Sequence, residues 1–204
     1  MTQTLLLFFS SGFVLGIFHA FDADHVVAIN TLITKSKNIL STLKISLFWG
    51  LGHSLTLLIT ALIVFLFLGS LPEKISLFFE FVVGLILIYL GLSSFHSNLE
   101  SSLKKISGHK KSFGIGIAHG LAGSGVIILF FLTRLNTLSE IIFYVFIFGI
   151  GSILGMGLIA LSFHYFFNIL SKKKLLPTSI IQKIVASISV VVGFYMLVSI
   201  IWLY

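Results

Sequence analysis

The sequence contains no cysteine among its 204 residues. This absence excludes disulfide bonds, thiolate metal sites, iron–sulfur clusters and thiol redox chemistry. Charge is also scarce, because only 9% of the residues are charged, compared with about a quarter in a typical soluble domain. The 13 basic and 6 acidic side chains cannot cover a soluble surface, and 57% of the residues are apolar. The composition therefore excludes an ordinary soluble protein and a disordered one, and it indicates an integral membrane protein.

Long apolar runs take the place of the missing charge. A membrane-spanning helix needs about 20 predominantly apolar residues, and six stretches of the chain meet this requirement. The runs are continuous rather than alternating, which favours helices over a β-barrel. We therefore predict an all-α integral membrane protein with six transmembrane helices in a single polytopic domain, residues 1–204. The stretches are 5–31, 44–69, 75–97, 112–133, 138–168 and 179–203.

The basic residues gather in alternate connections between these stretches. Eleven of the 13 lie in or beside the first, third and fifth connections, whereas Lys74 and Arg134 lie on the opposite side. By the positive-inside rule, the basic connections face the cytoplasm and both termini lie outside the cell membrane. Topology thus accounts for the net charge of +7, and nucleic acid is not an expected partner. The eleven are Lys35, Lys37, Lys44, Lys104, Lys105, Lys110, Lys111, Lys172, Lys173, Lys174 and Lys183.

Two pairs of similar strings indicate an internal repeat. The string GIFHAFDADHVVAI at 16–29 resembles GIAHGLAGSGVIIL at 116–129, and WGLGHS at 49–54 resembles FGIGSI at 148–153. The offsets are 100 and 99, but the third and sixth stretches show no convincing match. Three helices per unit would insert the second half with opposite polarity, so we predict a 3+3 inverted repeat with halves of about 1–100 and 101–204. Chance similarity between glycine-rich apolar helices is the alternative.

Four ionisable residues lie close together in the first apolar stretch: His19, Asp22, Asp24 and His25. Each costs about 2–3 kcal/mol at the centre of a membrane helix, so such groups persist when they face a polar interior and bind something. On a regular helix, His19, Asp22 and His25 share one stripe about 120° wide. Asp24 faces another side, so it would need a local distortion to join them, or it would orient an imidazole from behind.

Two further histidines, His53 and His119, reach a similar depth from the second and fourth stretches. Imidazole and carboxylate groups together suit borderline divalent ions such as Ni²⁺, Co²⁺, Zn²⁺ and Cu²⁺, whereas Ca²⁺ and Mg²⁺ prefer oxygen ligands. Either histidine could instead be a hydrogen-bonded packing residue. The predicted metal ligands are His19, Asp22, Asp24, His25, His53 and His119, and the predicted interfacial histidines are His96, His109 and His164.

The string HAFDADH at 19–25 resembles the H-x4-D-H signature of the nickel/cobalt transporter family (NiCoT), and LGHS at 51–54 resembles that family's second motif. This chain departs from the family at Phe18, where a basic residue is common, and at Ile29, where an aspartate commonly precedes the asparagine. Residues 119–125 lack the acidic groups of the family's second half. The resemblance implies a short relative that transports nickel or cobalt as its substrate, with the metal and the direction left open.

Together these features predict a membrane permease for divalent transition-metal ions, with no catalytic residue and no cofactor. Proton coupling is a further prediction, because protonated histidines release a metal ion. The predicted partners are the ion and the lipid bilayer, with a metallochaperone or a second copy of the chain as candidates. Two alternatives stay open. One is a metal-binding accessory or sensor subunit, and the other is an intramembrane metal-dependent enzyme, although the chain lacks an HExxH string.

Overall fold

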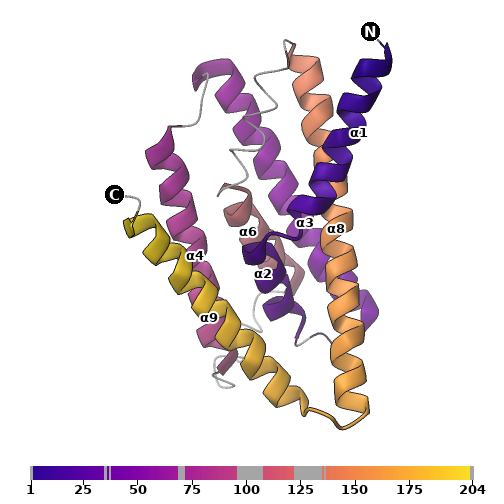
Figure 1. The fold of residues 1–204 in the computed structure, drawn as a ribbon, viewed down its shortest axis with the longest axis vertical. Coiled ribbons are helices and arrows are strands. Elements are labelled where there is room, and N and C mark those ends of the chain that lie inside the picture. The colour runs from indigo at the N-terminus through magenta and orange to yellow at the C-terminus, as the bar shows by residue number, and fades with distance from the viewer. Residues whose placement is uncertain are drawn as a thin grey trace.

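The helices of the computed structural model follow the apolar stretches of the sequence, and they run alternately up and down a long bundle (Figure 1). The structure describes residues 2–34, 36, 38–68, 72–95, 108–121, 135 and 137–202. All regular elements within these ranges are helical, as the composition predicted. They are α1 (Thr2–His19), α2 (Ala23–Ile33), α3 (Ile39–Ile63), the π-helical turn η1 (Val64–Leu68), α4 (Glu73–Phe95), α6 (Gly108–Leu121), α8 (Leu138–Lys172) and α9 (Thr178–Trp202).

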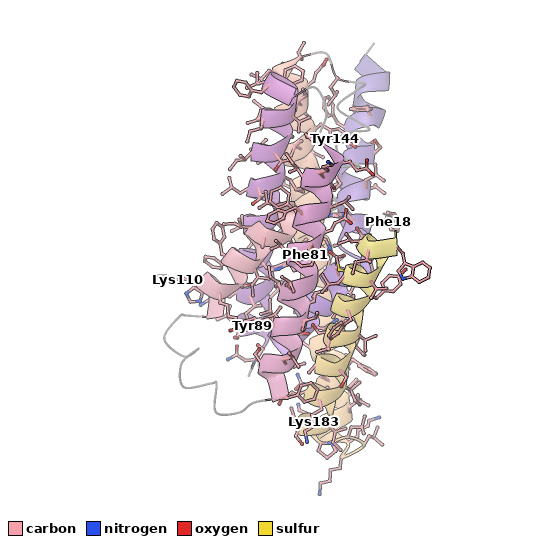
Figure 2. The ribbon with its side chains drawn as sticks, turned by 90° about the vertical axis from the view of Figure 1, so that its left-hand side faces the viewer. Phe18, Phe81, Tyr89, Lys110, Tyr144 and Lys183 are labelled. Atoms are coloured by element: carbon pink, nitrogen blue, oxygen red, sulfur yellow. The ribbon has the colours of Figure 1, made fainter. Side chains whose placement is uncertain are left out.

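Four of the described helices are long and apolar enough to cross a membrane, and α1 with α2 makes a fifth span if the bent pair counts as one. Their outward faces are apolar: Phe18, labelled in Figure 2, is 65% exposed and Trp202 is 86% exposed. These features describe a multi-pass membrane protein. The fourth predicted span is described only as far as Leu121, and 122–133 lies outside the described residues. Six spans therefore stay a prediction.

The first apolar stretch is not one helix, and the prediction of a continuous span over 5–31 is wrong. Helix α1 ends at His19, a turn covers Ala20–Asp22, and α2 leaves at an angle of 58°. Asp22 occupies the N-cap position of α2 with an extended ψ of 141°. Aspartate is favoured at an N-cap, and Asp24 adds a negative charge to the positive end of the α2 dipole. The new helix thus begins among the acidic residues that suggested a metal site, although the Asp22 side chain makes no capping hydrogen bond.

Glycines allow close packing in two pairs of helices that run in the same direction, α1 with α8 and α3 with α6. We call each of these glycine contacts between two helices a glycine seam. In each pair, a glycine from each helix packs against a backbone carbonyl oxygen of the other helix. A Cβ added at any of these glycines would lie too close to that oxygen to be accommodated. Only glycine allows this close approach of backbones. The four contacts are Gly16 on Phe148, Gly151 on Phe13, Gly116 on Trp49 and Gly52 on Phe113.

The α4 and α9 helices form a separate antiparallel pair on the left of Figure 1. A Cβ on Gly91 would lie 2.6 Å from the carbonyl oxygen of Ala186. Between the glycine contacts, Ser189 donates a hydrogen bond of 2.8 Å to the carbonyl of Leu87. Helix α2 lies between this pair and the rest of the bundle, because it contacts both α9 and α8. The broken half of the first span is therefore enclosed by both parts of the structure.

His164, one of the predicted interfacial histidines, is buried inside the bundle, and its depth in the membrane stays a prediction. It is 8% exposed, and its Nδ1 is 2.9 Å from Oγ1 of Thr42. Helix α8 continues to Lys172, two turns beyond His164, and α3 begins beside it at Ile39. A helix longer than expected thus covers the histidine. His109 is exposed, as predicted, and His96 lies outside the described residues.

The glycine seam between α3 and α6 can be tested with two glycines of α6. Replacing Gly116 by alanine forces a methyl group against the Trp49 carbonyl, whereas Gly114 has nothing within 4 Å of its added Cβ. We expect Gly116→Ala to destabilise the protein by about 1–3 kcal/mol through overpacking. Gly114→Ala should leave stability unchanged or raise it slightly, because alanine favours helix. Thermal unfolding in detergent measures both, and equal melting temperatures would contradict the seam.

Candidate metal centre

Three histidines from three helical elements converge beside the break in the first span. His19 ends α1, His25 lies in the first turn of α2, and His53 lies in the middle of α3. Their exposures are 4%, 3% and 0%. One ring nitrogen from each lies within 4.8 Å of the other two. The predicted ligands His19, His25 and His53 therefore form one buried group, as a single ion would require.

The closest approach within this group is 3.2 Å, between Nε2 of His19 and Nε2 of His53. Two nitrogen lone pairs at this distance repel each other unless a proton or a cation lies between them. A divalent ion bound at about 2.1 Å from each nitrogen would subtend an N–ion–N angle of roughly 100°. That angle lies between the tetrahedral and octahedral values, so the separation of the two nitrogens suits one shared ion.

The two aspartates stand behind the imidazoles. Oδ1 of Asp24 lies 2.9 Å from Nδ1 of His25. A carboxylate only accepts, so Nδ1 of His25 carries the hydrogen and Nε2 keeps its lone pair for an ion. Oδ2 of Asp22 lies 2.8 Å from Nδ1 of His19. The alignment there falls short of a hydrogen bond, so this contact is electrostatic, but it favours the same tautomer.

The acidic side of the centre is its accessible side. The side chain of Asp22 is 50% exposed and that of Asp24 is 21% exposed, whereas the imidazoles are buried. Oxygen atoms of both aspartates also group with a ring nitrogen of His25 within 4.8 Å. His25 thus belongs to the imidazole group and to the acidic group. A cation that approaches from the open side would meet carboxylates first and imidazoles second.

Aromatic rings close the inner side of the centre. Trp49 is fully buried and lies one turn before His53, and the two rings stack at 14° with centroids 5.7 Å apart. Its centroid is also 5.2 Å from that of His25. The ring centroid of Phe148 lies 5.4 Å from that of His19. The sequence prediction did not include Trp49 in the site, although its place in the string WGLGHS was a usable signal.

His119 lies next to the centre but outside both groups of candidate ligands. It is fully buried on α6, with its ring centroid 5.8 Å from that of His25 and 5.3 Å from that of Trp49. Its Nδ1 donates to the carbonyl of Ile115 at 3.2 Å. The structure therefore brings five of the six predicted ligands together and places the sixth beside them.

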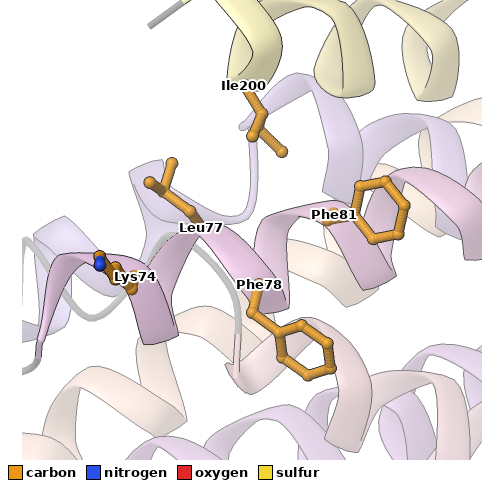
Figure 3. Close-up of a pocket in the computed structure, with 5 residues that line it drawn as sticks. All are labelled: Lys74, Leu77, Phe78, Phe81 and Ile200. Carbon is orange, nitrogen blue, oxygen red and sulfur yellow. The ribbon is translucent and has the colours of Figure 1, made fainter. Parts of the chain in front are cut away.

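An open groove lies elsewhere, between α4 and α9 (Figure 3). Its volume is about 340 Å³, and it contains none of the predicted ligands. Apolar side chains and one lysine line it, as expected of a surface that faces lipid. The lining residues are Lys74, Leu77, Phe78, Phe81 and Ile200.

Comparison with known proteins fits this centre. Residues 5–81 match the sequence model of the NicO family, described as "High-affinity nickel-transport protein", and the matched region holds the three histidines and both aspartates. The urease accessory protein UreH of Bacillus sp. (strain TB-90) is 36% identical over 168 aligned positions, and the match covers 74% of this chain and 74% of UreH. This chain belongs to the NicO family. The resemblance to nickel/cobalt transporters is thereby confirmed, and no solved structure matches this NicO protein.

Trp49 provides an optical test of the metal centre. The chain has two tryptophans, and Trp202 is 86% exposed at the end of α9. In a Trp202→Phe variant, we expect Ni²⁺ or Co²⁺ to quench most of the remaining fluorescence, because open-shell ions quench emitters at short range. Adding His53→Ala should weaken the binding measured by this quenching at least tenfold. Quenching that persists in Trp49→Phe but is absent in Trp202→Phe would place the ion elsewhere.

Proposed function

We propose that this NicO protein is a membrane permease for Ni²⁺ or Co²⁺, with the ion bound between His19, His25 and His53. The convergence of three buried imidazoles at a broken membrane helix carries the proposal. Ionisable groups at membrane depth mark ion pathways. Broken helices at mid-membrane are a recurrent way to build a transporter site. Family membership supports the same function.

The donor set favours the metals named in this proposal. Nitrogen donors suit borderline ions such as Ni²⁺ and Co²⁺, and the chain offers no thiolate to a softer ion. In the proposed site, Asp24 and Asp22 orient the rings through their Nδ1 atoms rather than occupying ligand positions. Carboxylates in this position raise the basicity of an imidazole ligand and fix its direction. The ion is cargo, so moderate affinity suits the function better than a closed structural site.

We infer further that the two halves form the predicted inverted repeat, and the glycine seams support this. Gly16 corresponds to Gly116 at the offset of 100, and Trp49 corresponds to Phe148 at the offset of 99. The contact of Gly16 with Phe148 is therefore equivalent to that of Gly116 with Trp49. The same offsets convert the ring contact of His19 with Phe148, 5.4 Å, into that of His119 with Trp49, 5.3 Å. Chance similarity of sequence strings would not reproduce the register of packed helices.

The packing of α4 against α9 also supports the repeat, although the sequences of these two helices showed no convincing match. At an offset of 102, Gly84 corresponds to Ala186 and Gly91 corresponds to Gly193. The contact of Gly84 with Gly193 is therefore equivalent to the contact of Ala186 with Gly91. The hydrogen bond from Ser189 to Leu87 joins two positions with the same offset. In this scheme the third helices of both halves pack against each other across the repeat axis.

The proposed orientation places both termini outside the cell membrane. Lys172 ends α8 and Lys183 lies near the start of α9, so both lie at one end of the bundle, whereas Lys110 in the first turn of α6 lies nearer its middle; Figure 2 labels Lys110 and Lys183. By the positive-inside rule this end faces the cytoplasm. A cytoplasmic metallochaperone or a second copy of the chain remains a predicted partner. A sensor subunit or an enzyme is a weaker proposal, because the family is one of transport proteins.

Uptake of radiolabelled nickel and cobalt tests the permease. We expect His19→Ala, His25→Ala and His53→Ala to reduce flux at least tenfold, because each removes one of three ligands. His109→Ala is the matched control, since His109 is an exposed histidine in the first turn of α6. Preloaded cells distinguish export from uptake.

The same assay separates ligand from orienting roles. Asp24→Asn should weaken binding about 10- to 100-fold, the range expected for a group behind a ligand. Equal accumulation in wild type, in all histidine variants and in cells without the protein would contradict a permease.

Proton coupling remains part of the proposal. Only a neutral imidazole binds metal, so a more acidic entry side should slow uptake and a more acidic exit side should speed release. Flux into proteoliposomes with imposed pH gradients of either sign measures this effect. Flux that is flat across pH and unchanged by a protonophore would leave a permease without proton coupling.

A further inference from the structure

His119 is a buried group that the three-histidine site leaves unused. It is fully buried, and its Nε2 has no hydrogen-bond partner within the part of the chain that the structure describes. Because the Ile115 carbonyl can only accept, the hydrogen bond of 3.2 Å fixes the proton on Nδ1. The lone pair therefore sits on Nε2. A buried acceptor without a partner is costly, and such groups call for an explanation.

The distance from His119 to His25 suits a shared ion. Two imidazoles on one tetrahedral ion have ring centroids roughly 5.2 Å apart, and these two are 5.8 Å apart, so a small movement of either ring would let them share an ion. The His25 ring also lies 4.5 Å from that of His19 and 4.9 Å from that of His53. His25 thus lies beside His119 as well as beside His19 and His53, and its single Nε2 lone pair can bind one ion at a time.

The repeat relation gives these positions a common origin. His119 corresponds to His19 at the offset of 100, and Ser152 corresponds to His53 at the offset of 99. Ser152 is also fully buried, and its Oγ has no hydrogen-bond partner among the described residues. The second half therefore offers an imidazole and a hydroxyl where the first half offers two imidazoles. A site built on it would bind a borderline divalent ion more weakly.

We propose that His119 and His25 form a second, weaker station for the transported ion. The ion passes from the three-histidine site by ligand exchange: its bonds to His19 and His53 break, its bond to His25 stays, and a bond to Nε2 of His119 forms. This proposal rests on the proposed permease function. Transport needs sites weak enough to release the ion, and two adjacent sites divide one difficult release into smaller steps.

Comparing binding with flux separates a station from a primary ligand. We expect His119→Ala to keep Ni²⁺ binding, measured by Trp49 quenching, within about threefold of wild type and to lower flux at least tenfold. His119→Gln keeps the size of the side chain and a donor toward Ile115, so a packing role predicts restored flux and a ligand role does not. Wild-type flux in His119→Ala overturns the station, and so does flux restored by His119→Gln. If His119→Ala loses both Ni²⁺ binding and flux, His119 is a ligand of the primary site and the second station is overturned.

A single thiol provides a direct signal of the ion at position 119. In the cysteine-free chain, His119→Cys combined with His19→Ala and His53→Ala should give a sulfur-to-cobalt charge-transfer band when Co²⁺ is added. The band should disappear when His25→Ala is added. Gly114→Cys in the same background is the control on the exposed side of α6 and should give no band. No band at position 119 overturns the station, whereas absent wild-type flux would overturn the permease itself.

Discussion

The burial of imidazoles in a membrane bundle is the constraint on which the rest of this structure depends. A polar group away from water is costly unless another group satisfies it, and the centre satisfies its histidines on one side only. Nδ1 of His25 and Nδ1 of His119 donate to Asp24 and to the Ile115 carbonyl, whereas Asp22 approaches Nδ1 of His19 without a hydrogen bond. The Nε2 atoms of His19 and His53 lie 3.2 Å apart, whereas those of His25 and His119 have no hydrogen-bond partner among the described residues. A hydrogen on Nε2 of His53 or a bound cation can lie between these two nitrogens of His19 and His53, so an ion at this place would replace a hydrogen bond within the protein.

Close backbone packing makes this arrangement possible. The glycine seams bring α1 against α8 and α3 against α6 at distances that side chains would prevent. His19 and His53 belong to different seams, so the seams determine how closely their rings approach. Trp49 contributes twice, because its carbonyl faces Gly116 and its indole ring covers His53. Packing and ligand placement therefore cannot be separated at this position, and a change in the seam would alter the metal centre as well.

Much of the centre could be read from the sequence, because charge is so scarce that His19, Asp22, Asp24 and His25 stand out within an apolar run. The break at Ala20–Asp22 was missed, since a long apolar run conceals a capping signal when read with helical periodicity alone. The burial of His164 depends on Thr42, 122 positions away, and no local pattern contains that contact. Likewise, α4 and α9 match through Gly84 and Ala186, two small residues whose equivalence shows only once the helices are packed.

The break also determines how an ion could leave. A regular first helix would hold His19 and His25 in one rigid hydrogen-bonded ladder, whereas the turn at Ala20–Asp22 gives each its own helix. His19 then lies on α1, which packs on α8, while His25 lies on α2, which contacts α9 as well as α8. The proposed ligands are thus distributed over separate elements, and a shift between these elements would not require breaking a helix. A site that must bind and then release an ion needs this freedom, and in the proposed site the break that gives it lies among the aspartates next to the two rings.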